Sequence, residues 1–141
     1  MKVLVTGGAG YIGSHMVKYL IKKKCSVTVI DNLSTGYRNA VKNCTFVQGD
    51  LADQQLIEEV LAETHFDAVF HFAAFSQVGE SVVYPLKYFR NNVSNTANLL
   101  HAMEQAKVRY LVYSSSAAVY GEPEGDSISE SDPTSPINPY G

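Results

Sequence analysis

Short runs of apolar residues alternate along the chain with segments in which apolar residues recur every three or four positions. The runs are typical of buried strands, and they lie at residues 3–6, 27–30, 44–47, 68–70 and 110–113. The other segments indicate amphipathic helices, whose apolar residues are Ile12, Met16, Val17 and Leu20, then Leu56, Ile57, Val60 and Leu61, then Phe89, Val93, Ala97, Leu100 and Met103. Strands that alternate with helices need crossover connections. The pattern therefore predicts a doubly wound α/β domain with a parallel sheet covered on both faces.

Local signals mark the ends of these elements. Lys22, Lys23 and Lys24 close the first helix, where cations suit the helix dipole. Asp53 can cap the second helix, and Pro85 is suited to the first turn of the third. Beyond Gly121 the chain is rich in Pro, Ser and acidic residues, which predicts a loop. We expect all 141 residues to form one domain.

Composition excludes several classes of protein. The chain has 11 Lys and Arg against 14 Asp and Glu and a net charge of −3, without the basic stripe of a nucleic-acid binder. Its apolar runs are far shorter than the ~20 residues needed to span a bilayer, and no signal-peptide core follows Met1. Cys25 and Cys44 lack CxxC spacing, so we expect two buried thiols in a reducing cytoplasm. The four histidines show no metal-ligand spacing, and no metal is expected.

Glycines mark the junction between the first strand and the first helix. They stand at Gly7, Gly10 and Gly13 in a GxxGxxG pattern. In a dinucleotide site, the first would turn the chain, the second would let the backbone approach a pyrophosphate, and the third would let the helix pack closely on the strand. The N–H groups at the helix start would then face the phosphates. By itself the motif also fits an ordinary strand-to-helix turn.

An acidic residue after the second strand favours the dinucleotide interpretation. Asp31 stands 18 residues after Gly13, close to the ~20 expected for the acid that binds an adenosine ribose diol. Its carboxylate would accept hydrogen bonds from the 2′- and 3′-hydroxyls and repel a 2′-phosphate, so the expected cofactor is NAD rather than NADP. Asp50, after the third strand, could bind the adenine amino group or simply form a turn.

Seven sequence blocks occur in order along the chain. They are GGAGYIGSH at 7–15, DNLSTG at 31–36, FHFAA at 70–74, VGES at 78–81, NNV at 91–93, SSSAAVYG at 114–121 and NPYG at 138–141. With them the chain resembles the extended short-chain dehydrogenase/reductase family, and within it the UDP-glucose 4-epimerases. The resemblance implies a tightly held NAD and a UDP-hexose substrate that is inverted at C4 through a 4-keto intermediate.

The resemblance also implies two catalytic residues. The family uses a Tyr-x-x-x-Lys pair with a Ser or Thr; Tyr140 matches the Tyr and Ser116 the hydroxyl partner. The Lys would stand three residues beyond Gly141. Since this cation is expected to lower the pKa of the Tyr, we expect residues 1–141 to be an N-terminal fragment that is inactive by itself.

Further positions carried over from the family would line the cofactor. Backbone N–H groups of two residues would bind the pyrophosphate: Tyr11 and Ile12. The residues around the adenosine would be Asp31, Asn32, Leu33, Ser34, Thr35 and Gly36 at the ribose and Asp50 and Leu51 at the adenine. Those on the nicotinamide side would be Phe72, Ala73, Ala74, Phe75, Ser76 and Asn91. The family often has Lys at position 76, so one phosphate contact differs here.

Two other functions stay open at this point. A sugar-nucleotide 4,6-dehydratase of the same family needs an Asp-Glu pair after the catalytic hydroxyl, but Ala117 and Ala118 follow Ser116, which favours the epimerase. A non-catalytic NAD-binding module is the second alternative. We also expect a homodimer or other self-association, because the apolar stripe of the helix near residues 86–105 and the strand 110–113 would lack cover.

Overall fold

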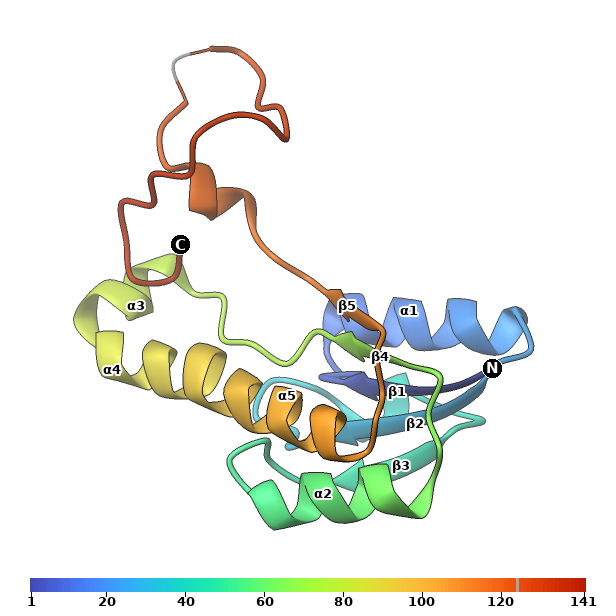
Figure 1. Cartoon of the computed structure of the whole chain (residues 1–141). Coiled ribbons are helices and arrows are strands. Elements are labelled where there is room, and N and C mark those ends of the chain that lie inside the picture. Colours follow the sequence, from blue (N-terminus) through green and yellow to red (C-terminus); the bar gives the residue numbers. More distant parts are fainter. Residues whose placement is uncertain (124) are drawn as a thin grey trace.

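Five strands form one parallel sheet in the order β3-β2-β1-β4-β5 (Figure 1). The computed structural model describes residues 1–123 and 125–141. The strands are β1 (Lys2–Thr6), β2 (Ser26–Asp31), β3 (Thr45–Gln48), β4 (Ala68–His71) and β5 (Leu111–Tyr113). Each predicted strand is present, with its ends shifted by at most one residue, and the predicted doubly wound parallel α/β fold of the Rossmann type is confirmed.

Helices cover both faces of this sheet. The first is α1 (Tyr11–Lys22), which lies on one face, whereas α2 (Gln54–Glu63) and α5 (Asn95–Gln105) lie on the other (Figure 1). Between β4 and α5 the chain forms α3 (Val78–Val83), α4 (Pro85–Tyr88) and the π turn η2 (Phe89–Ser94). The 3₁₀ turns are η1 (Arg38–Ala40) and η3 (Ala117–Tyr120). The predicted cap of α2 is confirmed, since the Asp53 side chain accepts from the Leu56 N–H at 3.1 Å.

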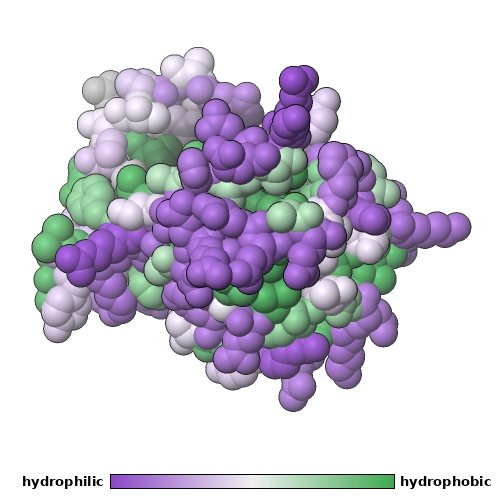
Figure 2. Space-filling model, turned by 60° about the horizontal axis from the view of Figure 1, so that its bottom comes forward, coloured by the Kyte–Doolittle hydropathy of each residue, from purple (hydrophilic) through white to green (hydrophobic). Residues whose placement is uncertain are grey.

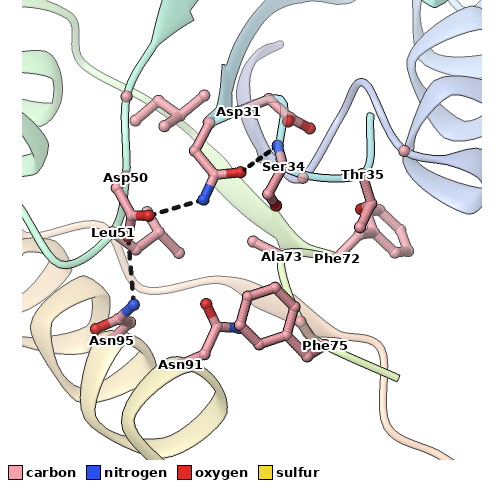
Figure 3. A pocket seen from close by; sticks show the side chains of 16 residues that line it. Asp31, Ser34, Thr35, Asp50, Leu51, Phe72, Ala73, Phe75, Asn91 and Asn95 are labelled. Carbon is pink, nitrogen blue, oxygen red and sulfur yellow. Dashed lines mark hydrogen bonds between the residues drawn. The ribbon is translucent and has the colours of Figure 1, made fainter. Parts of the chain in front are cut away.

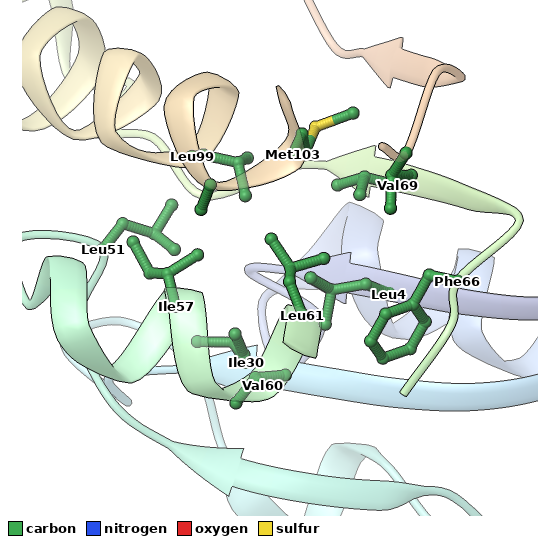
Figure 4. Packing of buried hydrophobic residues seen from close by; sticks show 12 residues of the cluster. Leu4, Ile30, Leu51, Ile57, Val60, Leu61, Phe66, Val69, Leu99 and Met103 are labelled. Carbon is green, nitrogen blue, oxygen red and sulfur yellow. The ribbon is translucent and has the colours of Figure 1, made fainter. Parts of the chain in front are cut away.

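The core has two halves because alternate residues of a buried strand point to opposite faces. Val3 and Val5 of β1 pack with Val17 and Leu20 of α1. Leu4, between them, faces the other way and joins the cluster under α2 and α5. That cluster is drawn in Figure 4 and includes Ile30, Ile57, Leu61, Val69, Leu99 and Met103. Truncating such a fully buried residue to Ala typically costs about 2–5 kcal/mol of stability.

The third predicted helix differs from its expected form. It begins at Pro85 as predicted, but the π turn interrupts it before α5. A π turn closes i→i+5 hydrogen bonds, so the 3.6-residue period used for the prediction does not continue through it. As a result Phe89 and Val93 are 51% and 59% exposed, while Leu99 and Met103 face the core.

Seen from the α2 side, most of the surface is hydrophilic, and hydrophobic residues show both in patches between the hydrophilic ones and at the edge where Figure 1 places α3 and α4 (Figure 2). Cys25 and Cys44 are unpaired, and both are half-buried rather than buried as predicted. Each directly precedes a strand, β2 or β3, and packs against the core from its edge. None of the helices within residues 1–123 and 125–141 combines the length and apolar character needed to cross a lipid bilayer.

Candidate functional site

A cavity of about 540 Å³ lies at the carboxyl ends of β1 to β4 (Figure 3). Sheet order reverses between β1 and β4, and ligands of open α/β sheets bind at such a switch point. The lining residues are Gly7, Gly10, Ile30, Asp31, Asn32, Ser34, Thr35, Gly49, Asp50, Leu51, Phe72, Ala73, Ala74, Phe75, Asn91 and Asn95.

The glycine-rich turn at the cavity is sterically obligatory at two positions. Gly7 has φ +70°, and a Cβ there would lie 2.5 Å from the nitrogen of Ala73. A Cβ on Gly13 would overlap the carbonyl oxygen of Gly7. These glycines therefore let β1, α1 and the segment after β4 approach one another closely. The turn leaves the N–H groups of Tyr11 and Ile12, the first residues of α1, without partners inside the helix.

Asp31 is the last residue of β2 and is 7% exposed. Its Oδ2 accepts from the N–H of Ala9 and its Oδ1 from the N–H of Leu33, both at 2.8 Å. Each carboxylate oxygen can accept two hydrogen bonds, so each keeps one acceptor site. The carboxylate is thus rigidly held beside the glycine-rich turn and can still bind hydroxyl groups of a ligand.

Asp50 connects three elements at another end of the cavity (Figure 3). Its Oδ2 accepts from the side-chain amide of Asn32 at 2.7 Å. Its Oδ1 accepts from the N–H of Ala52 at 2.8 Å and from the amide of Asn95 at 3.4 Å. These bonds tie the loops after β2 and β3 to the start of α5. Asp50 is therefore a structural anchor as well as a cavity-lining acceptor.

The segment after β4 is fastened to the π turn by an asparagine. The Asn92 amide donates to the Phe75 carbonyl and accepts from the Phe75 N–H, at 2.9 Å each. Asn92 also accepts from the amide of Asn91 at 2.8 Å. A π turn commonly places a functional residue in this way. The cavity wall formed by residues 72–75 is thus held from the helix side.

His71, at the end of β4, continues this connection into the core. Thr96 donates its hydroxyl proton to the Asn92 carbonyl at 2.7 Å, so its oxygen accepts from His71 Nε2 at 3.0 Å. Nδ1 of His71 then accepts from the Thr6 hydroxyl at 2.6 Å. This order of donors requires the neutral Nε2–H tautomer. Burial lowers the pKa of His71 to about 4, which keeps the ring neutral at physiological pH.

A second hollow of about 950 Å³ adjoins the cavity, and Ala74 lines both. Ser116 and Tyr140 line this hollow although they lie 24 positions apart in the chain. The oxygen of Ser116 caps η3 by accepting from the Ala118 N–H at 3.1 Å, which leaves its own proton free to donate. The structure therefore brings the two predicted catalytic hydroxyl groups to one hollow beside the cavity.

The two short helices next to this hollow carry a charged cluster. Lys87 and Glu80 form an ion pair at 2.6 Å, and Glu80 also accepts from the hydroxyl of buried Tyr88 at 2.8 Å. Hydrogen bonds from Lys87 and Tyr88 hold the pKa of Glu80 below its usual value. Burial, with the bond to Glu80, raises the pKa of Tyr88. The ammonium of Lys87 lies 4.7 Å from the centre of the Phe75 ring, so the cluster reaches the cavity wall.

Most of the predicted cofactor-binding residues line the cavity, and six do not. Those six are Tyr11, Ile12, Gly13, Leu33, Gly36 and Ser76. Tyr11 and Ile12 are exposed at the start of α1, and Gly13 packs beneath the turn. The prediction missed Ile30, Gly49 and Asn95. Asn91 lies in the π turn and Asn95 begins α5, so the helical period of the sequence could not identify Asn95 as a neighbour of Asn91.

Within residues 1–123 and 125–141, no three His, Cys, Asp or Glu side chains lie together as a group that could hold a metal ion.

Sequence comparison assigns nearly the whole chain to one family model. Residues 3–141 match the NAD dependent epimerase/dehydratase family. The chain is 55% identical, over 142 aligned positions, to a UDP-glucose 4-epimerase of Lactobacillus helveticus. It is 50% identical over 149 positions to a putative UDP-arabinose 4-epimerase of Arabidopsis thaliana. The alignments cover 100% and 99% of this chain, which spans 43% and 34% of those relatives.

Solved structures give the same result. A crystal structure of a UDP-glucose 4-epimerase superposes with a TM-score of 0.97 at 45% identity. The UDP-glucose 4-epimerase of Brucella ovis in complex with NAD superposes with a TM-score of 0.96 at 47% identity. In both cases the match covers 99% of this chain and 43% of the other.

Proposed function

Because the chain belongs to the NAD-dependent epimerase/dehydratase family, we propose that it carries the NAD site and the catalytic hydroxyl groups of a nucleotide-sugar 4-epimerase. The reaction would interconvert UDP-galactose and UDP-glucose. One observation carries this proposal: the cavity with Asp31 and the glycine-rich turn adjoins the hollow with Ser116 and Tyr140, and Ala74 lines both. A hydroxyl pair next to a dinucleotide site is what an alcohol–ketone interconversion needs.

The residues of the cavity fit NAD. The free acceptor sites of Asp31 suit the 2′- and 3′-hydroxyls of an adenosine ribose, whereas a 2′-phosphate would meet a fixed negative charge. The N–H groups of Tyr11 and Ile12 at the start of α1 suit the pyrophosphate. Asp50 and Leu51 would bind the adenine, and residues 72–76 with Asn91 would lie on the nicotinamide side. A side chain at Gly7 would clash with the backbone of Ala73, and one at Gly13 with the backbone of Gly7, so either would displace the turn that is proposed to bind the cofactor.

Two side chains would act on the sugar. Bound NAD would supply a hydride acceptor and donor for C4, so that a 4-keto sugar can form and be reduced on its other face. Tyr140 would take the proton of the 4-hydroxyl and return it later, as a general base and then a general acid. Ser116 has a free hydroxyl proton and would donate to the 4-oxygen, stabilising the charge that develops there.

We also propose that residues 1–141 associate with one another. The edge strand β5, paired only with β4 in the described sheet, and the exposed apolar residues of α3 to α5 favour self-association. They include Val82, Val83, Leu86, Phe89 and Val93. Light scattering on residues 1–141 tests this last point, and a monodisperse monomer would contradict it.

Product analysis tests the proposed reaction. The full-length gene product that contains these residues is incubated with UDP-galactose, and the nucleotide sugars are separated and identified. We expect UDP-glucose to appear until a constant ratio is reached, without net oxidation of either sugar. Because one relative is named as a UDP-arabinose 4-epimerase, UDP-arabinose is supplied in a parallel reaction. If only UDP-arabinose is converted, it replaces UDP-galactose as the assigned substrate. If neither nucleotide sugar is converted, the proposal is contradicted.

A further inference from the structure

The VGES block, residues 78–81, has no part in the function proposed above. It forms most of α3, and none of the residues that line the two described cavities comes from it. Ser81 is nevertheless completely buried. A fully buried polar side chain on a six-residue helix calls for a partner, and that partner identifies what the block does.

The partner is the backbone of Tyr140. The N–H of Tyr140 donates to the hydroxyl oxygen of Ser81 at 3.2 Å, across 59 positions of sequence. Ser81 donates its own proton to the carbonyl of Val78 at 2.7 Å. The single proton of the Ser81 hydroxyl points to Val78, so a lone pair of its oxygen is left to accept from the Tyr140 N–H. Figure 1 shows the result, with the end of the chain lying against α3.

The ring of Tyr140 is held by Tyr88 of α4, the short helix that follows α3. It lies edge to face with the ring of Tyr88, with the ring centres 6.4 Å apart and an angle of 78° between planes. Tyr88 is itself fixed, because its hydroxyl donates to Glu80 at 2.8 Å and accepts from the N–H of Gln77 at 3.1 Å. Backbone and side chain of Tyr140 are thus both held by residues 77–88.

Local bonds also act on the segment that carries Tyr140, in which the N–H of Ser135 donates to the carbonyl of Val119 at 2.9 Å. Within it, the Asn138 side chain accepts from the N–H of Gly141 at 3.0 Å. This bond closes the turn but does not orient it towards the hollow. The bond from Tyr140 to Ser81 does, because it joins the turn to α3.

We propose that Ser81 is a positioning residue, whose hydroxyl acceptor places the Tyr140 backbone so that the phenol faces the hollow containing Ser116. The inference rests on the catalytic role proposed for Tyr140. Misplacement of a catalytic group by about 1 Å can lower turnover by about a hundredfold. Loss of the hydroxyl should therefore lower kcat while leaving KM and the affinity for NAD unchanged, since Ser81 lines neither cavity.

Ser14 provides a matched control. It is also a buried serine in a helix, and its hydroxyl donates to the backbone carbonyl three residues earlier, that of Tyr11, at 3.0 Å. Ser81→Ala and Ser14→Ala therefore remove the same type of helix bond. Only the first also removes the acceptor of the Tyr140 N–H.

The test combines two measurements. In residues 1–141, amide hydrogen exchange is followed at Tyr140. We expect slower exchange than in the exposed loop around Ser127, and faster exchange after Ser81→Ala but not after Ser14→Ala. Fast exchange of the Tyr140 amide in the unmodified chain would overturn the inference whether or not the variants fold.

In the full-length gene product, Ser81→Ala should lower kcat by about 10- to 100-fold with KM within twofold. An unchanged kcat, or a change in KM alone, would overturn the positioning role. Tyr140→Phe separates this inference from the proposed function. If that variant keeps full turnover, the catalytic role of Tyr140 itself is wrong. If it is inactive and Ser81→Ala is normal, only the inference about Ser81 fails.

Discussion

The side-chain amide of Asn92 forms two hydrogen bonds with the peptide groups of Phe75, one to its N–H and one to its carbonyl, each 2.9 Å long. Phe75 lies in the wall of the candidate dinucleotide cavity, and Asn92 lies in the π turn between α4 and α5. This pair joins a segment without regular structure to a helix. The shape of the cavity wall therefore depends on Asn92, a residue that does not itself line the cavity.

Asn92→Ala should weaken the nicotinamide side of the cavity more than the adenosine side. It removes both bonds to Phe75, which we expect to cost about 1–3 kcal/mol of stability. Calorimetric titration with NAD and with ADP should show a larger loss of affinity for NAD. Asn98→Ala is the control, because it also removes a side-chain amide bond to the backbone. The Asn98 amide donates to the carbonyl of Leu51, on the adenosine side, at 3.1 Å. Equal losses for NAD and ADP in Asn92→Ala would contradict this account.

Asp31 should set the preference for NAD over NADP. We expect at least about a tenfold difference in Kd, because repulsion of a 2′-phosphate in a partly desolvated site costs on the order of 1–3 kcal/mol. Asp31→Asn should narrow that difference. It should also lower stability, because one amide cannot accept from both Ala9 and Leu33. Asp53→Asn is the control: it changes the net charge by the same amount, but Asp53 caps α2 and does not line the cavity. Equal affinities for the two cofactors in the unmodified protein would disprove the role of Asp31.

His71 should make the fold less stable in acid. Its pKa is about 4 in the folded chain against about 6.5 when unfolded, so the unfolded chain takes up a proton first as the pH falls. Its contribution is therefore fully present above pH ~6.5 and is lost between ~6.5 and ~4, by about 3 kcal/mol. Urea unfolding at several pH values measures this. His71→Asn should be less stable at pH 7 and should depend less on pH over that interval. An unchanged pH dependence would show that His71 does not titrate in this way.

Tyr140 and Ser116 should contribute unequally to turnover in the full-length gene product. Tyr140→Phe removes the proposed acid–base group, so kcat should fall roughly 10²–10⁴-fold while NAD stays bound. Ser116→Ala should cost less, because it removes one hydrogen bond to the 4-oxygen. Tyr120→Phe, in the neighbouring 3₁₀ turn, is the control for loss of a phenol hydroxyl. Near-normal turnover of Tyr140→Phe would place the proton acceptor elsewhere.

The sequence predicted the parts of the site whose chemistry is local. Gly7 and Gly13 stand at a strand-to-helix junction, and Asp31 ends the next strand, so their positions follow from the order of elements. The residues that connect the site to the rest of the fold were not predicted. Asn92 acts from a π turn, which interrupts the helical period, and Ser81 acts on a residue 59 positions away. Such roles depend on how α3 to α5 pack, which no local pattern encodes.

The succession of strands and helices along the chain also followed from the hydrophobic pattern, because buried strands and amphipathic helices have different periods. The exposed stripe of Phe89 and Val93 shows the limit of that reasoning. An apolar stripe indicates a face that can be buried, but not which partner buries it. The short helix α3 was missed for a related reason, since six residues provide less than two turns of pattern.

The central claim is that the protein inverts C4 of a UDP-hexose by moving a hydride away from that carbon and back to it. UDP-galactose labelled with deuterium at C4 tests it most directly in the full-length gene product. A hydride held within the site does not exchange with water, so the UDP-glucose formed should retain the label at C4. Formation of UDP-glucose that has lost the label to solvent would show inversion by proton removal instead. Absence of UDP-glucose altogether would contradict the assigned reaction.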